Sequence, residues 1–426
     1  MAKVEITKDK ITCYTPPSES TWANKTRADA LSWLNQNGLP DGREEYWKYT
    51  NPTCFNSSKS PVKNEIDHSY KKPIFDNIDC VKLVFIDGVL DLDSSDNITL
   101  AGIDIEPLAT ANKNENHWSL GYFGNIERDS QKVVKKTLAS LNTAFAVQGL
   151  TINITDKVTK PISIVYYHTD EISDALIHHV IKVEKNAHAT LLESGGIASR
   201  SNCVMELSLE ENASLDHIRV QGRSHERESI TYLFSNLEAN SSLKTFTLTV
   251  NGKLTRNEYI VNINGENAKA HVGGAIVGDA GFSHDDTVFI THSSPNCESR
   301  QVFKKVLRNG AKGVFQGKIL VKEGAQKTDG YQISQGLMLD DDSNFLAKPE
   351  LEIYADDVIC SHGSTCGEID PIALFYLTSR GIPKSEAQDM LVLAFLNEAI
   401  EEITSNQIKE IISKRLLDWM LKRHKS

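Results

Sequence analysis

The alternation of apolar and polar residues predicts a β-rich section from about residue 80 to residue 357. Short runs there follow the two-residue period of strands, among them "VKLVFIDGVLDLD", "ISIVYYH", "ALIHHVIKVE", "VMELSLE", "LKTFTLTV" and "KGVFQGKILV". One helical interruption is expected near residues 132–146. The middle of the chain is therefore predicted to be built mainly from strands.

The strands recur with a nearly constant period, and an asparagine beside a small residue marks each turn. These asparagines are Asn186, Asn212, Asn240 and Asn267, so the successive spacings are 26, 28 and 27 residues. Asn309 follows 42 residues later, which leaves room for one further coil with an insertion. Asparagine suits such turns because it tolerates a left-handed backbone. A fixed period predicts a solenoid, here a β-helix, since a meandering sandwich has no reason to keep one.

Helical regions are expected on both sides of this core. Residues 17–35 fit an amphipathic helix, and the aromatic-rich stretch "GREEYWKYTNP" after it is expected to pack the N-terminal region onto the β-rich body. Three parts follow from these patterns: an N-terminal helical region at 1–75, a β-helix core at 76–369 and a C-terminal helical domain at 370–426.

The C-terminal domain has clear helix boundaries. Asp370 and Pro371 form a helix start, Gly381 is a stop, and two further helices are predicted at 383–403 and roughly 405–424. The apolar surface of the helix at 383–403 is wider than one stripe, so it must be covered on more than one side. This width favours a platform for a partner protein, while the alternative is that the charged ends of both helices are solvated faces.

Composition narrows the class of protein. The chain has 426 residues, 40% of them hydrophobic and 24% charged, as in an ordinary globular protein with a full core. A net charge of −11 argues against binding nucleic acid through the overall field. No run approaches the ~20 apolar residues of a membrane span, and the first residues lack the apolar core of a signal peptide, so a cytoplasmic protein is expected. The seven cysteines are odd in number and scattered, which predicts free thiols.

Three candidate metal ligands, Cys360, His362 and Cys366, lie within seven residues of one another. If 352–361 is a strand, Cys360 and His362 point to the same face, and Cys366 follows a turn-like stretch at 363–365. Their spacing is not a standard zinc pattern and a fourth ligand is missing, although a partner subunit could supply it. The alternative is that both cysteines only fill space and that His362 bonds to the backbone.

Motifs for catalysis are weak. The stretch "GVFQGKIL" lacks the spacing and the hydroxyl of a nucleotide-hydrolysing loop. The acidic stretches Asp285-Asp286 and 340–342 raise the alternative of a β-helix carbohydrate-active enzyme. Adjacent acids on a strand alternate faces, however, which is poor geometry for acid/base work, so these carboxylates are expected in solvated loops. No enzyme is predicted.

Three stretches of the sequence can be compared with known families: "ADDVICSHGSTCGEIDPIALFYLTSRGIP", "GLPDGREEYWKYT", and "HSSPNCESRQVFKKVLRNGAKGVFQGKILVKEGAQKTDGYQ". They closely resemble the SufB/SufD family of the SUF iron–sulfur cluster assembly system, and within it the SufD branch. The resemblance covers nearly the whole chain. It implies a right-handed parallel β-helix between N-terminal and C-terminal helical regions, and a scaffold subunit of the SufBCD complex rather than an enzyme.

The resemblance also implies partners and sites. The sister subunit SufB would pair through the end of the β-helix, and the ATPase SufC would dock on the C-terminal helices; a homodimer is the alternative for the isolated chain. Cys360 and His362 would serve iron entry or ligate a nascent cluster together with a SufB cysteine, so only transient iron or a nascent cluster is expected, with no stable cofactor. Cys366 departs from the apolar residue that relatives usually carry. The residues implied for docking SufC are Phe375, Tyr376, Arg380, Leu391, Phe395, Glu398 and Trp419.

Overall fold

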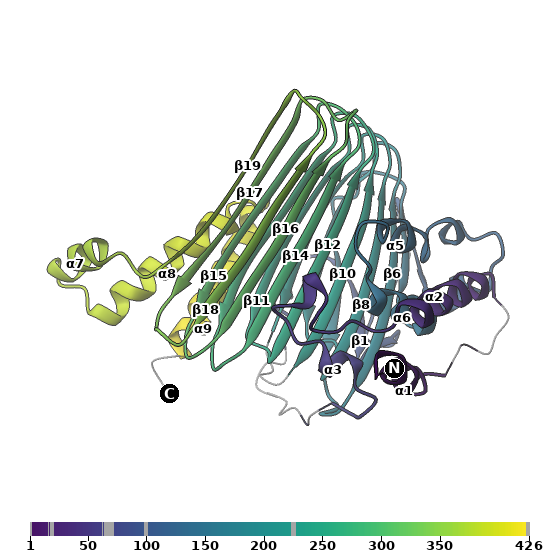
Figure 1. Ribbon diagram of the computed structural model, residues 1–426, viewed down its shortest axis with the longest axis horizontal. Helices are drawn as coiled ribbons and strands as arrows, with labels where there is room; N and C mark the ends of the chain where they lie inside the picture. Colours follow the sequence, from purple (N-terminus) through teal and green to yellow (C-terminus); the bar gives the residue numbers. More distant parts are fainter. Residues whose placement is uncertain are drawn as a thin grey trace.

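The fold is a parallel β-helix flanked by N-terminal and C-terminal helices, which confirms the predicted fold class (Figure 1). The computed structural model describes residues 2–15, 17, 21–61, 63, 72–97, 101–222 and 227–422. Within these ranges, no helix combines the length and the apolar character that crossing a membrane requires.

Two sheets form the walls of the β-helix, and each full coil contributes one strand to each of them. Sheet A contains, in sequence order, β1 (Val81–Ile86), β2 (Val89–Asp91), β5 (Ile162–Tyr167), β7 (His188–Gly195), β9 (Ser214–Gln221), β11 (Ser242–Val250), β13 (Lys269–Gly278), β15 (Glu298–Leu307), β17 (Thr328–Met338) and β19 (Val358–Gly367). Sheet B contains β3 (Ile103–Pro107), β4 (Leu150–Ile154), β6 (Asp174–Val183), β8 (Arg200–Leu209), β10 (Glu228–Leu237), β12 (Leu254–Ile263), β14 (Ser283–His292), β16 (Lys312–Val321) and β18 (Asn344–Ile353).

Successive coils stack in register, so equivalent residues form files along the β-helix. The four predicted turn asparagines adopt left-handed φ angles of 58° to 63°, as their residue type allows. The series continues at Asn296, which has a φ of 58° and lies 29 residues after Asn267. Asn309 lies instead at the opposite corner, between β15 and β16. Its assignment to the series was wrong, because both corners of a coil use Asn and spacing alone does not separate them.

The space between the two sheets, the lumen, holds the largest hydrophobic cluster. Inward-facing aliphatic residues from both sheets fill it, including Ile177, Leu207, Leu243 and Ile290, all at most 2% exposed. Burial of this continuous file of side chains supplies the main driving force for stacking the coils.

The N-terminal helices cover the outer face of sheet B (Figure 1). Trp47 is 5% exposed, and its ring lies 4.1 Å from the guanidinium of Arg256. This contact confirms that the aromatic stretch packs the N-terminal region onto the body. The helices are α1 (Ala2–Ile11), α2 (Ala23–Asn37), η1 (Glu45–Trp47), α3 (Thr53–Asn56), α4 (Leu108–Ala111), η2 (Trp118–Gly121), α5 (Asn125–Ser130) and α6 (Thr137–Phe145).

Two of these helices correspond to sequence predictions. α2 matches the amphipathic helix expected at 17–35, although it begins later, and positions 18–20 lie outside the described residues. α6 is the helical interruption expected near 132–146, and every one of its residues is buried. It packs between α2 and strand β8, so this segment joins the N-terminal helices to the core.

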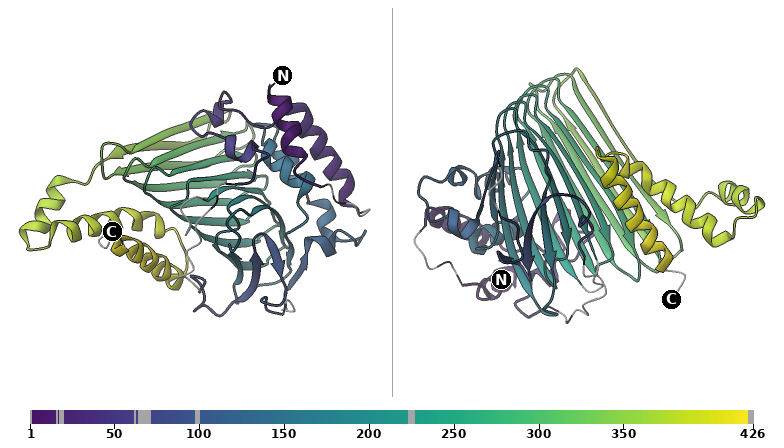
Figure 2. Two further views of the ribbon diagram at one scale, coloured as in Figure 1. Left: turned by 90° about the horizontal axis from the view of Figure 1, so that it is seen from below. Right: turned by 180° about the vertical axis from the view of Figure 1, so that it is seen from behind.

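The C-terminal helices α8 (Lys384–Ile400) and α9 (Asn406–Lys422) lie across the outer face of sheet A (Figure 2). Val392 and Leu396 are buried there against strand residues such as Leu248 and Val302. The wide apolar surface predicted for the first of these helices is thus largely covered within the chain, by β13, β15, α9 and the preceding helix α7 (Pro371–Ser379). Positions 423–424 of the second predicted helix lie outside the described residues.

The helix α7 (Pro371–Ser379) begins and ends where the sequence predicts. The side chain of Asp370 accepts a hydrogen bond from the backbone N–H of Ile372 at 2.8 Å, which caps the helix start. Gly381, with a φ of 89°, follows its end. Both views show α7 projecting away from the β-helix, beyond the end formed by β18 and β19 (Figures 1 and 2).

Candidate functional site

The three candidate metal ligands all lie on β19, the outermost strand of sheet A. The predicted strand at 352–361 is wrong, since β18 ends at Ile353 and β19 begins at Val358. The turn predicted at 363–365 is also wrong, because pairing with β17 holds these residues extended. The apolar pattern predicts one strand here because apolar residues continue from the end of β18 into the start of β19. These two strands belong to different sheets.

Pairing with β17 fixes the direction of the three side chains. His362 stands opposite Gln332 in the parallel ladder, and Gln332 faces Gly317 across the lumen. Residues two apart on a strand share a face, so Cys360, His362 and Cys366 all point toward the lumen side of β19. The prediction that Cys360 and His362 share a face therefore agrees with the strand register.

The surroundings of the three side chains differ. Cys360 is half-buried in a small cluster with lumen residues such as Ile319 and Leu351, and this burial raises the pKa of its thiol. His362 and Cys366 are exposed. The Sγ atom of Cys366 lies 4.0 Å from the Sδ atom of Met338.

Distance along the strand separates Cys366 from the other two. At ~3.3 Å of rise per residue, the Cα atoms of Cys360 and His362 are ~7 Å apart, while Cys366 lies ~20 Å beyond Cys360. Ligands of one ion lie within ~2.3 Å of it, so Cys360 and Cys366 do not share a mononuclear site. In the part of the chain that the structure describes, no three or more His, Cys, Asp or Glu residues are placed to hold a metal ion. Cys360 and His362 therefore form an incomplete pair.

This pair lies at an open end of the β-helix. Neither β18 nor β19 has a further neighbour in its sheet among the described residues, and both are 10 residues long. The opposite end finishes differently, with the antiparallel strands β2 and β3. Exposed apolar side chains mark the open end, with Tyr354 60% and Ile359 73% exposed. Long unpaired edges with apolar residues are sites for pairing with another chain.

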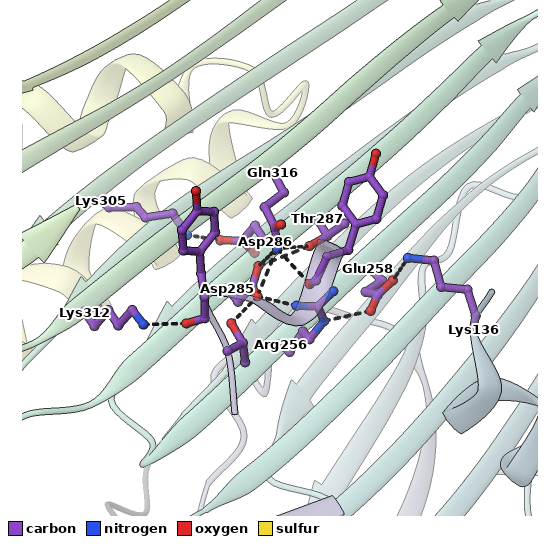
Figure 3. A network of polar contacts seen from close by, with 12 residues as sticks. Lys136, Arg256, Glu258, Asp285, Asp286, Thr287, Lys305, Lys312 and Gln316 are labelled. Carbon is purple, nitrogen blue, oxygen red and sulfur yellow. Dashed lines mark hydrogen bonds and ion pairs between the residues drawn. The ribbon is translucent and has the colours of Figure 1, made fainter. Parts of the chain in front are cut away.

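The acidic pair Asp285-Asp286 forms no open catalytic site. Asp285 points outward and accepts hydrogen bonds from Arg256 and Thr50, while Asp286 points into the lumen and forms an ion pair with Lys305 (Figure 3). Both carboxylates are at most 1% exposed. The expectation that they lie in a solvated loop is wrong, but the expected alternation of faces is confirmed. Fixed cations neutralise both groups, which leaves neither free for acid/base chemistry.

A second buried polar cluster lies inside the lumen around Glu193, and no motif in the sequence points to it. Glu193 accepts hydrogen bonds from Tyr166 at 2.8 Å, from His217 at 2.7 Å and from Arg219 at 2.6 Å. Burial alone would raise the pKa of Glu193, but Arg219 and His217 outweigh it and hold the pKa well below its usual range. The signal for this cluster in the sequence is a set of polar residues at inward positions of otherwise apolar strands. These positions can be recognised as inward only once the pairing register of the strands is known.

The residues implied for docking fall into two groups. On α7, Phe375 is 73% exposed and Tyr376 is 56% exposed, and the Arg380 guanidinium lies 5.0 Å from the Tyr376 ring. Ile372, which the sequence interpretation omitted, is 77% exposed beside them. These four residues form what we call the α7 surface.

The second group contacts the β-helix. Trp419 is 8% exposed, with the Arg308 guanidinium 4.6 Å from its ring. Glu398 forms an ion pair with Lys304. Phe395 is half-buried in the same interface with sheet A, and Leu391 on the same helix is also half-buried.

Comparison with known proteins supplies the remaining evidence. Residues 166–395 match the family model described as "SUF system FeS cluster assembly, SufBD core domain". The chain is 26% identical to the iron–sulfur cluster assembly protein SufD of Escherichia coli (strain K12), over 94% of this chain and 93% of that protein. It is 25% identical to the SufD protein of Bacillus subtilis (strain 168), with 92% of each chain covered. The chloroplastic protein ABCI7 of Arabidopsis thaliana is 29% identical over 49% of this chain and 44% of its own length.

Proposed function

The chain belongs to the SufBD family of the SUF iron–sulfur cluster assembly system, and we propose that it serves there as a non-catalytic scaffold subunit that pairs with SufB and carries SufC. The observation that carries this proposal is the place of Cys360 and His362 on the lumen side of an unpaired edge strand. Two potential ligands at an open end need a partner chain to complete the site.

The open end supports a partner made of strands. A second β-helix that adds strands to β18 and β19 would satisfy their unpaired backbone groups and cover Tyr354 and Ile359. SufB, as the sister protein of the same family, is the partner we propose. A second copy of this chain is the alternative occupant of the same end.

Cys360 and His362 take part in iron entry or in holding the nascent cluster in this proposal. Thiolate and imidazole are good ligands for iron, and a thiolate from SufB would add the ligand that this chain lacks. Iron and the nascent cluster are cargo here, so the isolated chain holds neither stably. Cys366 lies too far along β19 to join the same ion and is left out of the ligand set.

The α7 surface is the docking site that we propose for SufC. It exposes Ile372, Phe375 and Tyr376 on a helix that projects from the body (Figure 1). An apolar patch of this kind on a projecting helix fits a groove of a partner. Trp419 is not part of this surface, because it packs α9 onto the β-helix.

Co-expression with SufB and SufC tests the proposal. The complex is purified through a tag on this chain, and native mass spectrometry gives its subunit composition. We expect a complex of all three proteins, and a version of this chain that ends at Asp370 is expected to retain SufB and lose one SufC. Recovery of the chain alone or only as a homodimer would overturn the proposed partners.

The ligand assignment has its own test. Iron and sulfide are measured per complex for Cys360→Ala and His362→Ala, with Ser364→Ala as the matched control on the same face of β19. Both ligand variants are expected to keep the subunit composition and to lose most of the iron and sulfide, while the control stays at the parent level. Ligand variants that load as fully as the parent would contradict the assignment.

The alternative of a β-helix carbohydrate-active enzyme finds no support in the acidic residues. Asp285 and Asp286 point to opposite faces and are neutralised by buried cations. Asp340 accepts hydrogen bonds from the backbone N–H groups of Asn309 and Ser343, which is a structural role at a coil turn.

A further inference from the structure

Two glutamines behind the candidate site are buried without hydrogen-bond partners. Gln301 on β15 and Gln332 on β17 are both 0% exposed. The Nε2 and Oε1 atoms of both side chains have no hydrogen-bond partner among the residues that the structure describes. Buried amides are normally hydrogen-bonded, so an unpartnered pair calls for a functional reason.

The register places these glutamines in one file with His362. Gln301 pairs with Gln332, and Gln332 pairs with His362, on the neighbouring strands β15, β17 and β19. Paired residues in parallel strands project to the same face, so the three side chains lie side by side in the lumen. The file ends at the open end of the β-helix, with the exposed imidazole as its last member.

The opposite wall of the lumen holds the Gln332 amide in place. A Cβ atom at Gly317 would lie 2.6 Å from Nε2 and 2.7 Å from Oε1 of Gln332, so only glycine leaves room for the amide there. Elsewhere the chain does join amides of successive coils, as in the bond from Asn212 to Asn186 at 3.0 Å. In this position the Gln332 amide has no bond to Gln301, and its neighbour on the outer side is His362.

We propose that Gln332 is the positioning residue of His362: the amide oxygen, which is unpaired among the described residues, rotates to accept the N–H of one ring nitrogen of its strand neighbour and leaves the lone pair of the other nitrogen directed at the incoming iron. Histidine ligands usually donate their second ring N–H to such an outer partner, which fixes the tautomer and the ring direction. A neutral amide orients the ring without adding negative charge beside the thiolate of Cys360. Gln301 lies one strand further inside, next to Gln332 and not next to the imidazole.

The inference rests on the proposed role of His362 as a ligand. Gln332→Met keeps the length and shape of the side chain and removes the acceptor. Gln301→Met makes the same change one strand further from His362 and is the matched control. Since both substitutions remove unpartnered polar atoms, neither is expected to lower the melting temperature of the full-length chain.

Two measurements then test whether Gln332 orients the His362 ring or only fills space in the lumen. The ring tautomer of His362 is read from ¹⁵N shifts of the full-length chain labelled at histidine, with His362→Ala for assignment. We expect one tautomer in the parent and in Gln301→Met, a mixture in Gln332→Met, and recovery of one tautomer in Gln332→Glu, which restores an acceptor. In the complex with SufB and SufC, Gln332→Met is expected to weaken apparent Fe(II) affinity about tenfold or more.

The outcomes separate the role of Gln332 from the role of His362. If His362→Ala reduces iron loading but Gln332→Met leaves both the tautomer and the Fe(II) affinity unchanged, Gln332 has no positioning role. If His362→Ala leaves iron loading unchanged, the proposed ligand fails, and the tautomer measurement still decides whether Gln332 orients the ring. A Gln332→Met chain that keeps one tautomer overturns the inference in either case.

Discussion

Gly317 and Gln332 face one another across the lumen so closely that a Cβ atom at position 317 would lie 2.7 Å from the Cδ atom of the glutamine. Gly317 lies on β16 of sheet B and Gln332 on β17 of sheet A. The amide therefore spans the lumen, and the absence of a side chain at 317 is what gives it room. The two walls are matched to one another residue by residue at this point.

This match predicts a conditional effect of Gly317→Ala. In the parent chain the added methyl group must displace the Gln332 amide, so the free energy of unfolding should fall by about 1–3 kcal/mol. In a Gln332→Ala background the same substitution should have little effect, because the space is free. Urea unfolding of the four chains measures this. Gly367→Ala, with nothing within 4 Å of its added Cβ atom, is the control.

The ionic network on sheet B is centred on Arg256, and substitution of this residue tests its contribution to stability. Its fully buried guanidinium donates to Asp285 and, at 2.7 Å, to Glu258 (Figure 3). Arg256→Met leaves Asp285 buried without this ion-pair partner, while Glu258 keeps its ion pair with Lys136, so the free energy of unfolding should fall by about 3–5 kcal/mol. Lys185→Met, which breaks the exposed pair with Glu211, should cost no more than about 1 kcal/mol in the same urea titration. Equal effects of the two substitutions would contradict the importance of burial.

Much of the fold was predictable from the sequence because the solenoid repeats its local rules. The alternation of apolar residues, such as Leu and Ile, with polar residues predicts the strands. The constant spacing from Asn186 to Asn267 predicts the coils. The pattern did not distinguish the two corners of a coil, which is why Asn309 was misplaced. It also did not show that a strand break separates Ile353 from Val358, since both flanks are apolar.

The candidate site was only partly predictable, for a different physical reason. Cys360 and His362 stand out locally, and their shared face needs only the two-residue period of a strand. Gln332 lies 30 residues earlier and is brought beside His362 by the register of β17 and β19. The room for its amide depends on Gly317 from the other sheet. Long-range register of this kind has no signature in any one segment.

Glu127 predicts a pH dependence of stability. It is buried on α5, and burial together with the nearby Glu206 raises its pKa to about 8. Glu206 in turn forms a hydrogen bond with His178 at 2.9 Å. Because the folded-state pKa lies above the unfolded value of about 4.3, the folded state favours the protonated form. The stability from this group is full below about pH 4 and is lost as the pH rises toward 8.

Glu127→Gln keeps a neutral side chain at all pH values and should remove this dependence. Urea unfolding of both chains between pH 5 and pH 9 measures the difference. We expect the parent to lose free energy of unfolding relative to the variant up to about pH 8, and the difference to level off above it. A constant difference across the range would contradict the raised pKa of Glu127.

The α7 surface predicts a loss of SufC without a loss of stability. Phe375→Ser combined with Tyr376→Ser removes apolar area of α7 at two side chains that are 73% and 56% exposed. Native mass spectrometry of the complex should then show less bound SufC, while the melting temperature of the isolated chain stays within about 1 °C of the parent, as expected for exposed positions. Trp419→Ala is the contrasting variant. It removes a buried aromatic side chain, so it should lower the melting temperature of the isolated chain.

Thiol reactivity tests the orientation of β19 directly. All seven cysteines are free thiols, and only thiolates react quickly with iodoacetamide. Cys366 is exposed, whereas burial raises the pKa of Cys360, and burial raises the pKa of Cys203 in the lumen to about 12. At pH 8, peptide mass spectrometry should find Cys366 modified before Cys360, and Cys203 modified only after unfolding in urea. Binding of SufB should slow the reaction of Cys360. Rapid modification of Cys203 in the folded chain would show that the lumen is not closed to solvent. Equal modification rates for Cys360 with and without SufB would place the partner somewhere other than the open end of the β-helix.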